Sequence, residues 1–179
     1  LLFPLSIGAA CALVEKANPE ALAAAIAAYR ASVCFTSPTA YRAIALLAAQ
    51  RDLSSLRKCV SAGEALPAAT RKLWHDVTGI QIIDGIGSTE LLHIFISATE
   101  AQARGGATGY VVPGYEACVL GDDGQPLPPG QVGRLAVRGP TGCKYLADER
   151  QKTYVQNGWN LTGDAYLIDP ADGQFVYQA

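Results

Sequence analysis

The chain has 179 residues, half of them apolar and 17% charged, so it can bury a core as one domain or as two small lobes. Its formal net charge is only -2 and its 14 basic residues are scattered, which excludes the concentrated basic surface typical of nucleic-acid binding. The longest stretch of the first part without a charge or a breaker, residues 21–29, is far shorter than the roughly 20 apolar residues that span a bilayer, so no membrane partner is expected.

The start of the chain and its cysteines narrow the class of protein. Leu1 is not an initiator methionine and residues 1–12 lack the pattern of a signal peptide, so we expect an internal piece of a longer protein. The cysteines are odd in number and far apart, with no CxxC pair and no histidine at metal-ligand spacing. They predict buried thiols in a reducing cytoplasm. They are Cys11, Cys34, Cys59, Cys118 and Cys143.

Helix and strand signals alternate through the first hundred residues. Asn18 and Pro19 form a helix start, a cap followed by a proline at the first helical position, and the predicted helix continues to Arg30. Further helices are predicted after Ser37-Pro38 and over 66–78, and strands over 31–36, 56–60 and 79–83. Short apolar strands between helices predict an α/β fold, with a mostly parallel sheet covered on both faces by flanking helices.

The composition changes near Arg104, after which most of the glycines and prolines occur. Strand-like runs at 117–120, 134–138, 165–168 and 174–177 are separated by turns rich in glycine and aspartate. This half is predicted to be a small antiparallel β-barrel-like subdomain. We therefore divide the chain into an α/β subdomain, residues 1–104, and a β-rich subdomain, residues 105–179.

Two segments at the ends of predicted strands have the composition of a ligand site. The small residues of Ser61-Ala62-Gly63-Glu64 would let the backbone approach a flat ligand, although an ordinary capping box explains them too. The segment from Asp84 to Glu90 combines two glycines and two hydroxyls with a carboxylate that can hold Mg2+ beside a phosphate. A glycine turn before a capped helix is the competing interpretation, and a Rossmann fingerprint lacks its third glycine.

A third segment, Trp159 to Asp164, precedes the strand predicted from Ala165. A carboxylate on a rigid turn, such as that of Asp164, can accept hydrogen bonds from both vicinal hydroxyls of a ribose. The sequence Thr-Gly-Asp is also common in plain turns, so this segment alone is not specific.

Taken in order, these segments resemble the successive core motifs of the adenylate-forming superfamily of acyl-CoA synthetases, luciferases and peptide-synthetase adenylation domains. Residues 61–64 are similar to its S-x-G-E segment, 85–90 to its Y-G-x-T-E motif, 130–146 to its G-E-L-x-V-x-G-P segment and 162–164 to its T-G-D motif. The resemblance covers nearly the whole chain, and four ordered matches are far more specific than one. It implies that both subdomains belong to the family's large N-terminal AMP-binding domain.

The resemblance also implies roles for individual residues. Asp164 would bind the ribose hydroxyls, while Thr89 would contact the α-phosphate and Glu90 would bind Mg2+, which makes Thr89 and Glu90 the candidate catalytic residues. The residues that would border the adenine are Gly63, Glu64, Asp84, Gly85 and Ile86, with Asp84 accepting from its exocyclic amine. Ile86 stands where the family usually has an aromatic residue, so aliphatic contact would replace ring stacking.

The run from Asp84 to Ser97 resembles the benzoate-CoA ligase branch, and residues 139–143 and 157–160 resemble 2-aminobenzoate-CoA ligases. In that branch the residues right after the glutamate line the acid pocket. The candidates for contacting the aromatic acid are therefore His93 and Ile94, together with Ala62 and Gly87. A core histidine satisfied by the backbone explains His93 equally well.

The implied function is an ATP-dependent aryl-acid CoA ligase, whose partners are an aromatic carboxylic acid, ATP and CoA; the sequence does not indicate an oligomeric state. The chain has no Ser/Thr/Gly-rich phosphate loop ending in lysine and no counterpart of the family's hinge and C-terminal domain. We therefore expect the isolated chain to be inactive. The alternatives are an acyl-CoA synthetase for another acid and a noncatalytic nucleotide-binding module.

Overall fold

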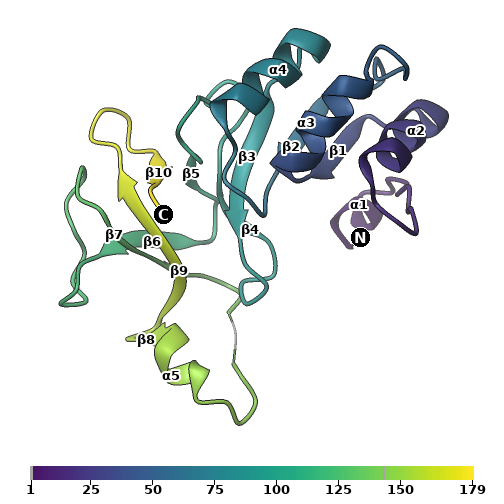
Figure 1. The fold of residues 1–179 in the computed structure, drawn as a ribbon. Helices are drawn as coiled ribbons and strands as arrows, with labels where there is room; N and C mark the ends of the chain where they lie inside the picture. The colour runs from purple at the N-terminus through teal and green to yellow at the C-terminus, as the bar shows by residue number, and fades with distance from the viewer. Residues whose placement is uncertain (1, 143) are drawn as a thin grey trace.

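Figure 1 shows the computed structural model, which describes residues 2–142 and 144–179. Two β-sheets organise the molecule: a five-stranded sheet that carries helices, and a curled sheet in the C-terminal half. Leu1 and Cys143 lie outside the described residues, so the predictions that concern them are not tested. Within the described residues, no helix combines the length and the hydropathy needed to cross a bilayer.

The N-terminal half alternates helices with strands, as its sequence predicts. Its elements are α1 (Leu2–Ser6), α2 (Pro19–Tyr29), β1 (Val33–Thr36), α3 (Pro38–Leu47), β2 (Lys58–Ser61), α4 (Ala68–Thr78) and β3 (Ile82–Gly87). Asn18 begins α2 by accepting a hydrogen bond from the Ala21 N–H at 2.8 Å, and Ser37 begins α3 in the same way. The predicted helices and strands of this half are confirmed, although β3 begins and ends later than expected.

The five-stranded sheet is parallel only in part. β1, β2 and β3 pair in parallel, but β4 (Ile94–Ser97) runs antiparallel to β3, and β5 (Tyr110–Val111) runs antiparallel to β4. A parallel pair needs a crossover of about a dozen residues or more, whereas β3 and β4 are joined by a short turn over residues 88–93. The prediction of a mostly parallel sheet is therefore right for β1 to β3 and wrong for β4 and β5, which the sequence analysis did not identify.

Helices α2, α3 and α4 share one hydrophobic core with the parallel strands. Tyr41 of α3 and Trp74 of α4 are fully buried and meet edge to face, with ring centroids 4.7 Å apart. On β1 the alternate side chains, Val33 and Phe35, point away from this core and remain 41% and 60% exposed. The sequence predicts helices on both faces of the sheet, but within the described residues one face of β1 remains uncovered.

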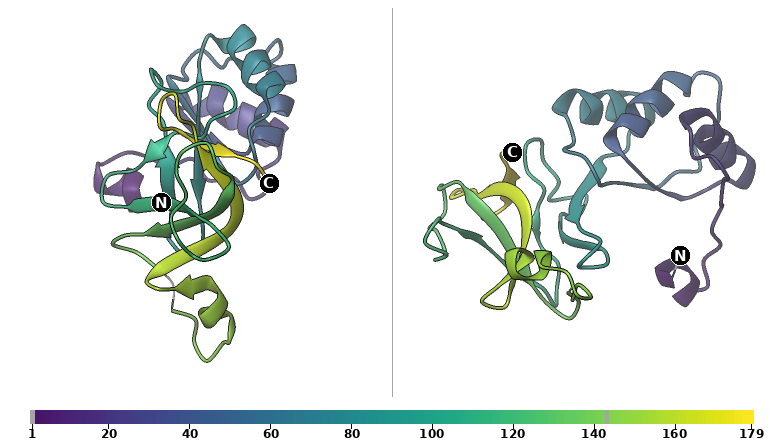
Figure 2. Two further views of the ribbon diagram at one scale, coloured as in Figure 1. Left: turned by 90° about the vertical axis from the view of Figure 1, so that its left-hand side faces the viewer. Right: turned by 60° about the horizontal axis from the view of Figure 1, so that its bottom comes forward.

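The C-terminal half forms an antiparallel sheet, as predicted. Its elements are β6 (Glu116–Leu120), β7 (Gly133–Arg138), α5 (Arg150–Tyr154), β8 (Val155–Gln156), β9 (Trp159–Ile168) and β10 (Phe175–Tyr177). The strands follow the order β10-β9-β7-β6, and β8 pairs with β9. Figure 2 shows this sheet as a curled layer beside the α/β part, with α5 at its far end.

The two sheets are joined by a shared core and by one ionic link. The core combines residues in and around β4 with residues of the second sheet: Leu91, Phe95, Ile96, Val119, Leu135, Val137, Tyr166 and Phe175. The Arg104 guanidinium donates to the carboxylates of Asp169 and Asp172 in the turn between β9 and β10. The first sheet continues past Arg104 into β5, and the division into residues 1–104 and 105–179 remains a prediction.

β9 begins earlier than the sequence predicts and contains the Thr-Gly-Asp segment that we expected to be a turn. Gly163 has a φ of 89°, and the register of β9 against β7 shifts at this point. A bulge at a glycine lets one strand continue where the local sequence favours a turn. Asp164 consequently projects from a strand of the second sheet.

Replacing Tyr41 with Phe tests how α3 holds the parallel strands. The Tyr41 hydroxyl lies 2.7 Å from the Cys34 carbonyl oxygen on β1 and 3.1 Å from the Val60 carbonyl oxygen on β2. Because the variant removes a buried donor from these acceptors, we expect its free energy of unfolding in urea to fall by about 1–2 kcal/mol. Tyr29→Phe is the control, since Tyr29 is 73% exposed. Superimposable curves for Tyr41→Phe and the unmodified chain would contradict the role of the hydroxyl.

Candidate functional site

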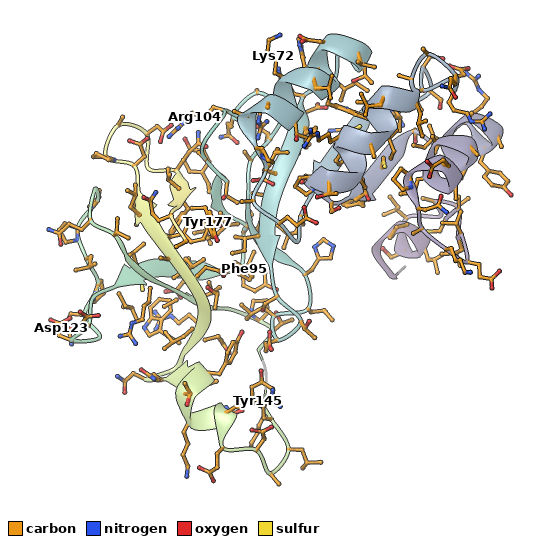
Figure 3. All side chains as sticks on the ribbon, in the orientation of Figure 1. Lys72, Phe95, Arg104, Asp123, Tyr145 and Tyr177 are labelled. Carbon is orange, nitrogen blue, oxygen red and sulfur yellow. The ribbon has the colours of Figure 1, made fainter. Side chains whose placement is uncertain are left out.

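A cavity of about 320 Å3 lies between the two sheets at the end of β3. Its walls come from the connection between β2 and α4, from α4 and β3, from the loop before β5, and from β9 and β10. Figure 3 shows Tyr177 in the space between β10 and β3. Segments about a hundred residues apart in the sequence thus share one cavity.

The cavity gathers most of the residues that the sequence singles out for the nucleotide. Those that line it are Gly63, Glu64, Asp84, Gly85, Ile86 and Asp164, and Gly87, a candidate for contact with the acid, lines it too. Ala62 is not among the lining residues, although its neighbour Gly63 is. All three segments identified in the sequence therefore contribute residues to a single space.

Glu64 does not form the capping box that was the competing interpretation of its segment. Its Oε2 atom accepts a hydrogen bond from the Thr39 hydroxyl at 2.6 Å, which ties the connection after β2 to α3. The cap position of α4 is Pro67, where no side chain makes a capping hydrogen bond. Of this segment, Gly63 and Glu64 line the cavity.

Asp84 is a desolvated carboxyl group in the cavity wall. Its Oδ1 atom is buried and has no hydrogen-bond partner within the described part of the chain. Burial raises the pKa of Asp84 from 3.8 to about 6, against the lowering effects of the Gly85 N–H and the Arg71 guanidinium. Such an oxygen is a strong acceptor that a ligand N–H could satisfy.

Asp164 faces the cavity from the second sheet, beside two aromatic residues that the sequence analysis missed. The Asp164 N–H donates to the Thr162 hydroxyl at 3.2 Å, which fixes the backbone at the bulge. Tyr166 lies on the same side of β9, two residues on, and its ring meets that of Tyr177 edge to face at 5.6 Å. The alternation along β9 is the signal that could have identified Tyr166. Arg71 and Thr108 are further lining residues that the sequence analysis did not identify.

Thr89 and Glu90 lie on the turn after β3 and are not among the residues that line the cavity. Thr89 is exposed, and the half-buried Glu90 accepts a hydrogen bond from the Tyr145 hydroxyl at 2.7 Å on Oε1. This hydrogen bond holds the pKa of Glu90 below its ordinary value. Glu90 thus lies outside the cavity that Asp164 lines, three residues beyond the lining residue Gly87.

His93 and Ile94 lie where β4 begins and do not line the cavity. Ile94 packs against β3, because a Cβ atom built on Gly85 would stand 2.9 Å from its Cγ2 atom. The His93 side chain is exposed, so it is not a residue of the core. Both residues remain candidates for contact with an acid only on the turn side of β3.

The described residues suit a Mg2+ ion whose ligands come partly from the protein and partly from the phosphates of a nucleotide. No three His, Cys, Asp or Glu side chains among them lie close enough to hold a metal ion together. Glu90 offers a single carboxylate, and Mg2+ commonly binds one or two carboxylates together with substrate phosphates. The donor set therefore suits a cation that arrives with phosphate groups, rather than a site independent of them.

Among known protein families, the one described as AMP-binding enzyme matches residues 1–145 of the chain. The chain belongs to the AMP-binding enzyme family. This result confirms the resemblance to adenylate-forming enzymes that the ordered motifs predict.

Relatives within the AMP-binding family include ligases of aromatic acids. The benzoate–CoA ligase of Thauera aromatica is 34% identical over 186 residues, which cover 99% of this chain and 34% of that protein. The anthranilate–CoA ligase of Pseudomonas aeruginosa is 35% identical over 173 residues, covering 94% of this chain and 33% of that protein. The solved structure of the anthranilate CoA ligase AuaEII in complex with anthranoyl-AMP matches with a TM-score of 0.93 and 40% identity, covering 99% of this chain and 35% of that one. The chain thus spans about a third of the length of these relatives.

Asp84→Asn tests the desolvation of the cavity wall. Because the pKa of Asp84 is raised in the folded state, its carboxyl group lowers the free energy of unfolding as the pH rises from about 4 to about 6. Above that range, folding must bury a charge. We expect Asp84→Asn to raise the free energy of unfolding by about 1–3 kcal/mol at pH 7.5 and to change it little near pH 4. Urea unfolding at the two pH values measures this. Asp122→Asn, at an exposed loop position, is the control, and equal effects of Asp84→Asn at both pH values would refute the explanation.

Proposed function

We propose that this chain is part of an ATP-dependent aryl-acid CoA ligase that acts on benzoate or 2-aminobenzoate. The observation that supports the proposal is that Gly63, Asp84 and Asp164 line one cavity. The chain is also 40% identical in sequence to a ligase whose structure was solved with anthranoyl-AMP. The cavity volume of about 320 Å3 is within the range of roughly 300–1,000 Å3 typical of small-molecule sites.

The cavity offers an adenosine group three kinds of contact. Asp164 would accept hydrogen bonds from both ribose hydroxyls. Asp84 would accept a hydrogen bond from the exocyclic amine of adenine on its Oδ1 atom, which has no partner among the described residues. Ile86 and Tyr177 line the cavity from opposite sheets, so Tyr177 would supply the aromatic contact that Ile86 lacks. Gly63, Glu64 and Gly85 complete the border of the ring.

The phosphate would leave the cavity past Gly87, toward the turn after β3. Thr89, whose hydroxyl is on the exposed turn, would donate to the α-phosphate, and Glu90 would hold Mg2+ jointly with the nucleotide phosphates. When bound, Mg2+ supplies positive charge that offsets the charge on the phosphates. The role of these residues is to orient the nucleotide and to stabilise charge that builds on the α-phosphate.

The reaction follows from the chemistry of a carboxylate, which is a poor electrophile because its charge is delocalised. The acid oxygen would attack the α-phosphorus of ATP, releasing pyrophosphate and forming the aryl-adenylate. The CoA thiol would then attack the acyl carbon, forming the thioester and releasing AMP. The aromatic acid would lie on the turn side of β3, where Ala62, Gly87, His93 and Ile94 are the candidate contacts.

We propose that the enzyme works in the cytoplasm, and the state of the cysteines supports this location. The four cysteines within the described residues, Cys11, Cys34, Cys59 and Cys118, are free thiols, as a reducing compartment would keep them. An acyl-CoA synthetase for another acid, or a noncatalytic nucleotide-binding module, would share the cavity. Dependence of binding on the aromatic ring separates our proposal from both.

The proposal predicts ring-dependent binding of a nonhydrolysable benzoyl-AMP mimic. Calorimetry should show that the benzoyl mimic binds more tightly than an acetyl mimic, and that Asp164→Asn weakens benzoyl binding by roughly ten- to hundredfold because charged hydrogen bonds to the ribose are lost. Asp122→Asn should bind like the unmodified chain. Equal affinities for the two mimics would favour the module, and unchanged binding by Asp164→Asn would remove the ribose contact from the proposal.

A second prediction concerns catalysis by the chain alone. It spans only about a third of its relatives and has no phosphate loop ending in lysine, so we expect no detectable pyrophosphate release with benzoate, 2-aminobenzoate and MgATP. A coupled pyrophosphate assay measures this, with a full-length benzoate–CoA ligase as the positive control. Turnover by the 179-residue chain would show that the residues described here suffice for adenylation.

A further inference from the structure

The carboxylate of Glu90 is held by a residue from a distant part of the chain. The Tyr145 hydroxyl donates to Glu90 Oε1 at 2.7 Å, although the two residues are 55 positions apart. Glu90 lies on the turn between β3 and β4, whereas Tyr145 lies between β7 and α5, where Figure 3 labels it. The contact therefore links the β-rich half to the turn that carries the candidate catalytic residues.

Tyr145 is itself fixed by three neighbours on and around α5. The Gln151 side-chain oxygen accepts from the Tyr145 N–H at 2.7 Å. The Arg150 guanidinium carbon lies 5.0 Å from the centre of the Tyr145 ring, and the Tyr154 ring meets it edge to face at 5.9 Å. These contacts limit the positions that the hydroxyl can take.

The backbone next to Glu90 is held from the same side. The Leu91 carbonyl accepts hydrogen bonds from the Thr141 hydroxyl at 2.8 Å and from the Tyr115 hydroxyl at 3.2 Å. Leu91 is fully buried, which anchors the end of the turn. The backbone next to Glu90 is therefore held at Leu91, and the Glu90 carboxylate is held by the Tyr145 hydroxyl.

We propose that Tyr145 is a positioning residue that aims the Glu90 carboxylate for Mg2+ bound with a nucleotide. The inference rests on the function proposed above. A hydrogen bond on Oε1 limits the orientations of the carboxylate and hence the directions that Oε2 can take. Among the described residues no group of three or more His, Cys, Asp or Glu side chains could hold the ion, so the direction of the Glu90 carboxylate matters for its binding. Partners that orient a metal ligand in this way typically change metal affinity about 10- to 100-fold when removed.

The opposite outcome is physically reasonable, which makes the sign of the effect informative. If the Tyr145 hydroxyl competed with Mg2+ for Glu90, its removal would strengthen the contribution of the metal. If Tyr145 served only to hold α5 against the turn, its removal would weaken nucleotide binding equally with and without metal. Positioning predicts a third pattern, in which only binding that depends on Mg2+ is lost.

The test measures how much Mg2+ tightens the binding of α,β-methylene-ATP to the full-length ligase, by calorimetry with Mg2+ and with EDTA. We expect Tyr145→Phe to reduce this tightening about tenfold and to leave the metal-free affinity unchanged. Glu90→Gln should abolish most of the tightening. Tyr110→Phe is the matched control, since Tyr110 is a half-buried tyrosine whose hydroxyl donates to the Asp172 carbonyl instead.

The outcomes separate the two proposals. Full tightening in Tyr145→Phe together with its loss in Glu90→Gln would overturn the role of Tyr145 and leave the proposed function standing. Stronger tightening in Tyr145→Phe would show competition and would also overturn it. Unchanged tightening in Glu90→Gln would remove Glu90 as the metal residue, and the positioning role would fall with it. Failure of the full-length protein to form any aryl-adenylate would refute the proposed function itself.

Discussion

Close packing of β4 against the end of β3 is the constraint on which the rest of the molecule depends. A Cβ atom at Gly87 would stand 2.6 Å from the His93 carbonyl oxygen, so a side chain at that position would force the two strands apart. With glycine there, the chain turns back at once and carries Leu91 and Phe95 into the core shared with the second sheet. That core seats β9 over the end of β3, and it is why Asp164 and Asp84, eighty residues apart, line the same cavity.

Asp84 and Asp164, two of the residues whose carboxyl groups line the cavity, lie in different environments. Asp84 is desolvated, and its Oδ1 atom has no hydrogen-bond partner among the described residues. This costs free energy, which a hydrogen bond donated by a ligand would recover. Asp164 is only partly buried, and a glycine bulge sets its direction. A buried polar atom without a partner does not by itself define the site. The Ser61 hydroxyl also lacks a hydrogen-bond partner in the described part of the chain, yet Ser61 does not line the cavity. Convergence of several segments does define it.

The features that could be predicted from the sequence are those with local signals. Asn18 and Ser37 cap helices through atoms three residues away, and each motif that indicates the family is contiguous. β4 was missed because its two central residues, Phe95 and Ile96, are both buried, so it lacks the alternation of a half-exposed strand. Tyr145 and Tyr177 were missed for another reason. Tyr145 contacts Glu90, which is 55 positions away, and Tyr177 lines the cavity together with β3 residues of the other sheet. No spacing within a segment encodes such contacts.

Because Glu90 lies outside the cavity, its position indicates how the proposed nucleotide would be oriented along β3. Asp84 and Gly87 both line the cavity, and a strand rises by about 3.3 Å per residue, so roughly 10 Å of β3 separate the end that would hold adenine from the end that leads to Thr89 and Glu90. A nucleoside laid along this strand would have its base at Asp84 and its phosphate at Gly87. On that axis Glu90 belongs outside the cavity, because the groups it would serve are the phosphates, and these must stay within reach of an incoming acid and a departing pyrophosphate. An enclosed Glu90 would instead be desolvated like Asp84, and desolvation disfavours the charged form of a carboxyl group that binds a cation.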